Sequence, residues 1–205
     1  TRPKLGMIHM AHYFRHPSLT AKMVATLDQL SGGRVIHFLD AGYQRREYVN
    51  YGLPWKEEMA DRLDDLHEAT ELILALWAAD GPLTFAGKAW QVTDAICNPK
   101  PVQQPHPPLW FGEAAPGGLA ACARFGQGWN TTPVSLPELA RRVRLLADAC
   151  AAIGRDPSEI ALTLETQVLI APTTEALREK LRTLLALAGQ QNHLPPEIAP
   201  YVKDY

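Results

Sequence analysis

The chain has 205 residues, of which 46% are apolar and 20% are charged, a composition typical of a soluble globular protein with one substantial core. A formal net charge of −2 and the lack of any run of about 18 apolar residues exclude an obvious nucleic-acid or membrane partner. Three cysteines at wide spacings argue against a disulfide framework, so we expect reduced, buried thiols in a cytoplasmic protein.

The first part of the chain alternates strand and helix patterns. Residues 5–10 form an apolar run typical of a buried strand, and a helix is expected from Pro17 to the glycine pair Gly32 and Gly33, which can adopt the left-handed conformation that ends a helix. Residues 34–39 predict a second strand, residues 43–55 a loop, and residues 57–79 a second helix. One face of the first helix repeats apolar side chains at spacings of four and three: Leu19, Met23, Leu27 and Leu30.

The alternation continues after a hairpin predicted near residues 82–92 and a proline-rich connector at 98–108. The expected elements are strands at 109–112, 128–130 and 159–170, and helices at 117–125, from Ser135 to Gly154, and from Thr174. Ser135 and Glu138 have the spacing of a capping box. This order predicts a parallel sheet with helices outside. We assign residues 1–189 to one domain and residues 190–205 to a polar C-terminal tail.

Few residues suggest catalysis by themselves. His9, His12 and His16 cluster early, but Pro17 starts the helix after them, so their spacing need not place the rings on one face, and no metal site is assigned. A metal hydrolase on these histidines stays the weakest alternative. His12, just past a strand end, is the better pocket residue. No G-x-S-x-G motif occurs, and no histidine lies near a cysteine in the sequence.

The stretch "PPLWFGEAAPGG", residues 107–118, runs from a strand pattern through small residues into a helix. Neither a P-loop motif nor a G-x-G-x-x-G motif occurs in the chain. Backbone N–H groups at a helix N-terminus can bind a phosphate without a charged side chain. The stretch is therefore either a phosphate cradle or a tight turn.

Three segments, in this order, carry a family resemblance. They are "ATLDQLSGGRVIHFLDAGYQRREYVNYGLP", then "RLDDLHEATELILALW" with "GPLTFAGKAWQV" and "PKPVQQPHPPLWFG", and finally "LAACARFGQGWN". Together they resemble the bacterial luciferase-like flavin monooxygenase family, which also holds deazaflavin-dependent oxidoreductases. The resemblance implies a TIM (β/α)8 barrel. Such barrels typically need about 250 residues, and residues 5–10 match the third strand, so we expect an incomplete barrel without its first two strand–helix units and its eighth strand. The chain is then either a fragment or a shortened relative that completes its core differently, for example by association.

The resemblance also implies a cofactor site. Its expected residues come from the end of the third strand, from the end of the fourth strand and from the turn after the fifth: Ile8, His9, Met10, Asp40, Gly42, Gly112, Glu113, Ala114 and Gly117. Asp40 and Glu113 depart from the family pattern. Two carboxylates could repel a phosphate, or they could point away from it. No catalytic residue is assigned, and His9 and His12 are the candidates.

The function implied is that of an oxidoreductase that uses reduced flavin mononucleotide (FMN) and oxygen on a small organic substrate. A deazaflavin (F420) enzyme that transfers a hydride is the alternative with the same fold. A non-catalytic barrel subunit that has lost its cofactor is the alternative of another class. The expected partners are a small-molecule substrate and further copies of the chain, in a homodimer or higher oligomer.

Overall fold

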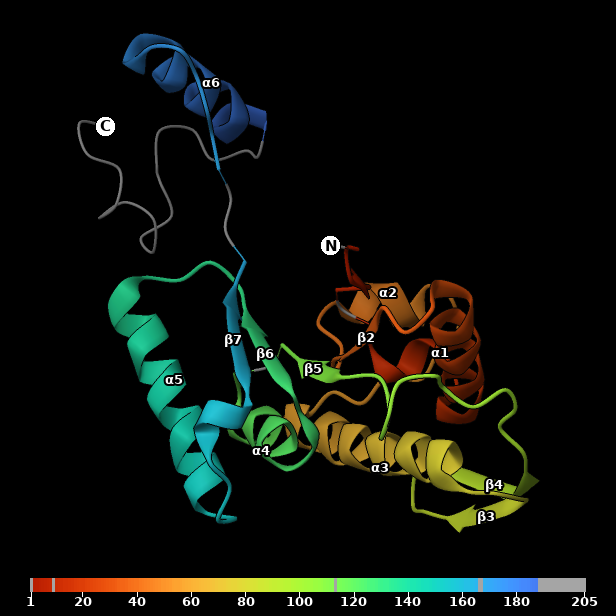
Figure 1. Ribbon diagram of the computed structural model, residues 1–205. Coiled ribbons are helices and arrows are strands. Elements are labelled where there is room, and N and C mark those ends of the chain that lie inside the picture. Colours follow the sequence, from red (N-terminus) through yellow and green to blue (C-terminus); the bar gives the residue numbers. More distant parts are fainter. Residues whose placement is uncertain (1, 9, 113, 166–167, 188–205) are drawn as a thin grey trace.

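The computed structural model describes residues 2–8, 10–112, 114–165 and 168–187. Its central feature is a curled sheet of parallel strands in the order β1-β2-β5-β6-β7 (Figure 1). The strands are β1 (Leu5–Gly6), β2 (Val35–Leu39), β5 (Leu109–Phe111), β6 (Gly128–Thr131) and β7 (Ala161–Leu164). The expected hairpin is observed as a separate antiparallel pair, β3 (Leu83–Ala86) and β4 (Gln91–Ala95).

Helices alternate with these strands along the chain. They are α1 (Pro17–Ser31), α2 (Arg45–Val49), α3 (Met59–Ala78), α4 (Pro116–Phe125), α5 (Leu136–Ala151) and α6 (Thr174–Leu187), with short 3-10 turns η1 (His12–Phe14) and η2 (Pro157–Glu159). Helices α1, α3, α4 and α5 pack on the outside of the sheet, and α6 stands apart from it (Figure 1). A closed barrel of this kind needs eight parallel strands, and the described residues form five. The architecture is an incomplete β/α barrel, as the sequence predicts.

The core lies between the sheet and helices α1, α3, α4 and α5. Side chains alternate along β5: Leu109 and Phe111 are fully buried in this core, and Trp110 points to the opposite face. There the indole of Trp110 lies against Gly128 of β6, where a Cβ atom would come within 2.3 Å of the ring. Gly128 therefore leaves the space that the ring of Trp110 occupies on this face of the sheet.

Asp28 joins two sequence segments that carry the family resemblance. Its carboxylate is fully buried at the C-terminal end of α1. Asp28 Oδ2 accepts hydrogen bonds from the backbone N–H groups of Val102 and Gln103, at 2.8 and 2.9 Å, and Oδ1 accepts one from Gln103 Nε2 at 2.7 Å. The proline-rich connector is thus fastened to α1, and it leads directly into β5. Gly32 and Gly33 end α1 with φ angles of 66° and 77°, as expected.

Several expectations differ from the structure. The apolar face of α1 is exposed, with 81% exposure at Leu30, whereas Ala21 and Ala25 on another face are completely buried. Small side chains let α1 approach α3 closely, and the Nε1–H of Trp77 donates to the backbone oxygen of Ala21 at 3.0 Å. The predicted loop at 43–55 contains α2, and the predicted strands at 5–10 and 159–170 are shorter, as β1 and β7.

None of the helices within the described residues is long and apolar enough to cross a membrane. All three cysteines are buried and unpaired, as expected, and burial raises the pKa of Cys122 to about 12.

Candidate functional site

A cavity of about 600 Å³ opens at the carboxyl ends of β2, β5 and β6. In parallel β/α folds this is the edge at which ligands bind. One residue directly follows each of these strands: Asp40 after β2, Gly112 after β5 and Thr132 after β6. The described lining is Asp40, Tyr43, Glu47, Gly112, Ala114, Thr132 and Arg142. We call this the mouth cavity.

Asp40 forms one wall, and its polar groups are engaged within the protein. Its Oδ1 accepts a hydrogen bond from the backbone N–H of Gly42 at 2.6 Å, which closes a tight turn after β2. Its backbone oxygen accepts from the backbone N–H of His12 at 3.2 Å and faces His12 Nδ1 at 3.1 Å. The wall is therefore linked to the segment that follows β1.

Gly42 shapes the loop beside this wall. Its φ angle is +90°, which side chains rarely tolerate, and an added Cβ would lie 2.6 Å from Oη of Tyr48. Tyr48 is fully buried on α2 and stacks on Phe14 with ring centroids 4.8 Å apart. Gly42 thus allows α2 to pack closely, and α2 carries Glu47 of the mouth cavity.

Arg142 of α5 forms the opposite wall. Its Nη1 donates to Thr131 Oγ1 at 2.8 Å and its Nε donates to Glu138 Oε1 at 2.8 Å. The predicted capping box is only half confirmed: the N–H of Glu138 donates to Ser135 Oγ, but the Glu138 carboxylate binds Arg141 and Arg142. Hydrogen bonds from these two guanidinium groups lower the pKa of Glu138 to about 2.

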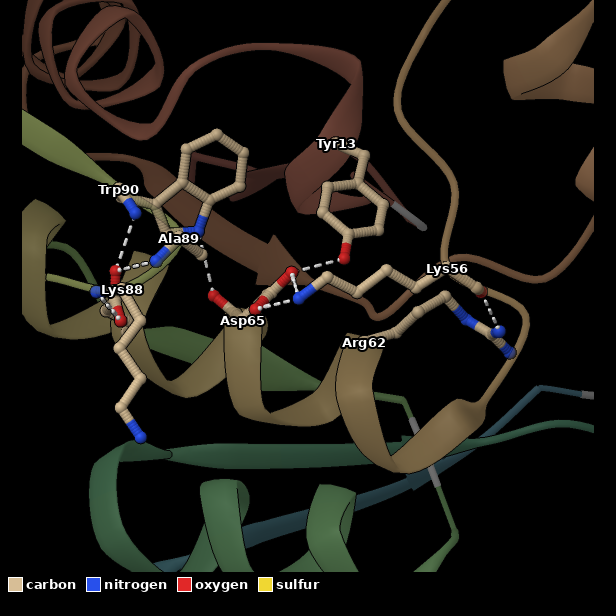
Figure 2. Close-up of polar contacts among 8 residues, drawn as sticks. Tyr13, Lys56, Arg62, Asp65, Lys88, Ala89 and Trp90 are labelled. Atoms are coloured by element: carbon tan, nitrogen blue, oxygen red, sulfur yellow. Dashed lines mark hydrogen bonds and ion pairs between the residues drawn. The ribbon is translucent and has the colours of Figure 1, made fainter.

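A second polar cluster lies around Asp65 of α3 (Figure 2). Tyr13 donates a short hydrogen bond to Asp65, and Lys56 Nζ lies 2.8 and 2.7 Å from its two carboxylate oxygens. Arg62 Nη1 donates to the backbone oxygens of Lys56 and Glu57 at 2.6 and 2.7 Å. Burial and the bond to Asp65 raise the pKa of Tyr13. The cluster holds η1 and the segment between α2 and α3 against α3.

His12, the catalytic candidate that the structure describes, is 5% exposed and packs on Tyr13 and Trp90. Because a carbonyl oxygen only accepts, its Nδ1 beside the Asp40 oxygen carries the proton. Its Nε2 is buried without a hydrogen-bond partner among the described residues, and burial lowers the pKa of His12 to about 4. The ring is neutral near pH 7 and is not part of the described lining of the mouth cavity.

The sequence model of luciferase-like monooxygenases matches residues 1–202. The chain belongs to this family. It is 31% identical over 175 residues to an F420-dependent glucose-6-phosphate dehydrogenase of Microbacterium testaceum, covering 84% of this chain and 51% of that protein. It is 33% identical over 183 residues to the pyrimidine monooxygenase RutA of Stutzerimonas stutzeri, covering 85% and 48%. The chain thus spans about half the length of these luciferase-like relatives.

Solved structures support the same fold. An F420-dependent secondary alcohol dehydrogenase, in complex with an F420-acetone adduct, aligns with a TM-score of 0.77 at 23% identity, over 89% of this chain and 55% of that one. The long-chain alkane monooxygenase LadA aligns with a TM-score of 0.76 at 18% identity, over 91% and 50%. At these identities the likeness shows the barrel fold alone.

The cofactor-site residues implied by the luciferase-like family fall into three groups. Asp40, Gly112 and Ala114 line the mouth cavity together. Gly42 and Gly117 have packing roles, because a Cβ on Gly117 would lie 3.0 Å from Leu63 of α3. The remaining residues are either not in the described lining or outside the described residues: Ile8 is 52% exposed, Met10 lines a different, apolar cavity beside α1, and His9 and Glu113 are not described.

Sequence reasoning missed Tyr43, Glu47, Thr132 and Arg142. The first two lie in the segment that was expected to be a loop; Tyr43 follows the turn after β2, and α2 places Glu47 in the same lining as Asp40. Arg142 lies on a helix whose charged residues look like a solvent face. Thr132 could have been found from the sequence, because it closely follows a predicted short strand and strand ends supply binding residues in this family's fold.

Proposed function

We propose that this chain is an oxidoreductase of the luciferase-like type that binds reduced FMN in the mouth cavity and uses oxygen to oxygenate a small organic substrate. The observation that carries the proposal is the cavity itself, which gathers Asp40, Gly112 and Ala114 at the ends of β2 and β5. Family membership supports it, since relatives include an FMNH2-dependent dimethylsulfone monooxygenase of Pseudomonas putida, 27% identical over 175 residues.

The residues present fit such a cofactor. A volume of about 600 Å³ is within the range of sites for cofactor-sized ligands. Gly112 and Ala114 leave room for close approach, and the Asp40 carboxylate is held by the N–H of Gly42 in its own turn. Glu113 lies outside the described residues, so its effect on a phosphate stays a prediction.

Bound reduced FMN would supply two electrons to molecular oxygen, with one oxygen atom going to the substrate and the other to water. The chain's own contribution is to bind, orient and exclude water. Tyr43 just before α2, Glu47 on α2 and Arg142 on α5 line the cavity around the strand ends. These residues would position the substrate and limit the access of solvent.

The same cavity could hold F420, which relatives with the same fold use, in which case the reaction would be hydride transfer. The test is to titrate the purified protein with FMN, reduced FMN and F420 and to follow the fluorescence of each cofactor. We expect saturable binding of FMN and its loss in Ala114→Trp, which fills the cavity. No saturable binding of any of the three would contradict the enzyme proposal and favour a non-catalytic subunit.

We also propose that the chain works as a homodimer or higher oligomer. The support is the exposed apolar face of α1, which lies beside β1 at an edge of the described sheet. Size-exclusion chromatography with light scattering tests this proposal. A stable monomer at micromolar concentration would contradict it.

A further inference from the structure

The guanidinium group of Arg142 is fixed in place at the edge of the mouth cavity. Two of its three nitrogen atoms are held, Nη1 by Thr131 on β6 and Nε by Glu138 on α5. Its side chain is only 20% exposed, compared with 55% for Arg141, which binds the same carboxylate. Nη2 donates no hydrogen bond to any residue that the structure describes. A preorganised donor of this kind loses little conformational freedom on binding an anion.

Arg142 is the only basic residue in the described lining of the mouth cavity. Arg141 and Arg142 share the single carboxylate of Glu138. Thr132, which lines the cavity beside Arg142, adds a hydroxyl group from the end of β6. The opposite wall carries the carboxylates of Asp40 and Glu47. The mouth cavity is therefore polarised, and an anionic group inside it is attracted to the wall formed by β6 and α5.

We propose that Arg142 and Thr132 form an oxyanion site at this wall of the mouth cavity that binds a phosphate monoester. Arg142 donates from Nη2, and Thr132 donates its hydroxyl, to separate oxygen atoms of the phosphate. Arginine suits this ligand because its planar fork matches the geometry of phosphate oxygens. The phosphate is that of a nucleotide cofactor or that of a phosphorylated substrate. The site deepens the proposed function but does not depend on it, since its walls are defined without any cofactor.

The test begins with inorganic phosphate, titrated at constant ionic strength and followed by ³¹P nuclear magnetic resonance. We expect saturable binding to the unmodified protein. In Arg142→Gln the dissociation constant should be at least about tenfold larger, because one charge-assisted hydrogen bond is lost. Arg141→Gln is the matched control, because it removes the same charge from the same carboxylate outside the cavity lining. We expect it to change the dissociation constant less than twofold.

A second variant covers the case in which Arg142→Gln does not fold, since Arg142 also holds Thr131. Thr132→Val removes one exposed hydroxyl and keeps the shape of the side chain, and we expect it to weaken phosphate binding about threefold. The absence of phosphate binding to the unmodified protein would overturn the proposal. Equal effects of Arg141→Gln and Arg142→Gln would also overturn it, because they would indicate a general surface charge.

Parallel titrations with FMN and riboflavin identify the source of the phosphate. A loss of FMN affinity in Arg142→Gln, with unchanged riboflavin affinity, assigns the site to the cofactor. Unchanged affinity for both, with phosphate binding still dependent on Arg142, assigns it to the substrate. Phosphate binding without any binding of FMN or F420 would sink the proposed function and leave the oxyanion site intact, so the two failures can be told apart.

Discussion

Replacing Asp28 tests how the incomplete barrel is held together. Asp28→Ala removes the acceptor of three hydrogen bonds, at 2.7 to 2.9 Å, from the connector that leads into β5. A hydrogen bond to a charged group contributes about 1.5–3 kcal/mol, such bonds are not additive, and two backbone N–H groups would lose their partner. We expect the free energy of unfolding to fall by about 3–5 kcal/mol.

Asp28→Asn separates charge from shape. Its side-chain oxygen can still accept from Val102 and Gln103, but its amide group opposes the donor Nε2 of Gln103, so we expect a smaller loss of about 1–2 kcal/mol. Gln29→Ala is the matched control on the same helix, because Gln29 Nε2 also bonds the connector, at the backbone oxygen of Lys100, but in an exposed position. Its cost should stay within about 0.5 kcal/mol.

Urea unfolding followed by tryptophan fluorescence measures all three variants, and the chain has five tryptophans to report the transition. From the most to the least stable variant, the expected order is Gln29→Ala, Asp28→Asn and Asp28→Ala. The reasoning is refuted if Asp28→Ala costs less than about 1 kcal/mol, or if it costs no more than Gln29→Ala.

Gly42→Ala should lower the free energy of unfolding by about 2 kcal/mol or more, because of the φ angle of +90° and the contact of the added Cβ with Tyr48 Oη. In thermal melts, the double variant with Tyr48→Phe should recover part of this loss of stability. If the stability losses of the two single variants simply add in the double variant, the contact between them is contradicted. Burial lowers the pKa of both His12 and His37 from 6.5 to about 4, so their neutral forms stabilise the fold above pH 6.5 and this contribution is lost as the pH falls towards 4. Between pH 6.5 and pH 5 we expect the free energy of unfolding, measured with urea, to fall by about 3 kcal/mol. In His37→Met the fall should be about half as large. If that variant shows the same change of stability with pH as the unmodified protein, this cause is refuted. The three buried cysteines should react with an alkylating reagent at the rate of unfolding, and rapid labelling in native buffer would show that they are accessible.

The alternation of strands and helices could be predicted from the sequence because local patterns specify it. Gly32 and Gly33 mark the end of α1, and Ser135 caps α5, as the residue types indicate. The orientation of α1 could not be predicted. Its leucine and methionine face satisfies the helical period, yet the buried face is the one with Ala21 and Ala25, because contact with α3 selects small side chains.

The candidate site was predictable only where the chain itself passes through it. Asp40 and Gly112 end strands, and strand ends can be recognised in a sequence. Arg142 comes from the outer layer, and nothing in its neighbourhood in the chain distinguishes it from the exposed Arg141. What separates the two is the position of Thr131, a contact across 11 residues that exists only once β6 and α5 have packed.

The attachment of the connector to α1 also bears on the order of folding. Asp28 and Val102 are 74 residues apart in the chain, and β2 with β5 encloses a segment of similar length. Contacts of such separation must first overcome the entropy of closing a long loop, so they form late, whereas α1 and β2 are neighbours and can associate early. Asp40 and Gly112 come from the two strands whose pairing waits for this closure. We therefore expect the mouth cavity to be among the last parts of the chain to form.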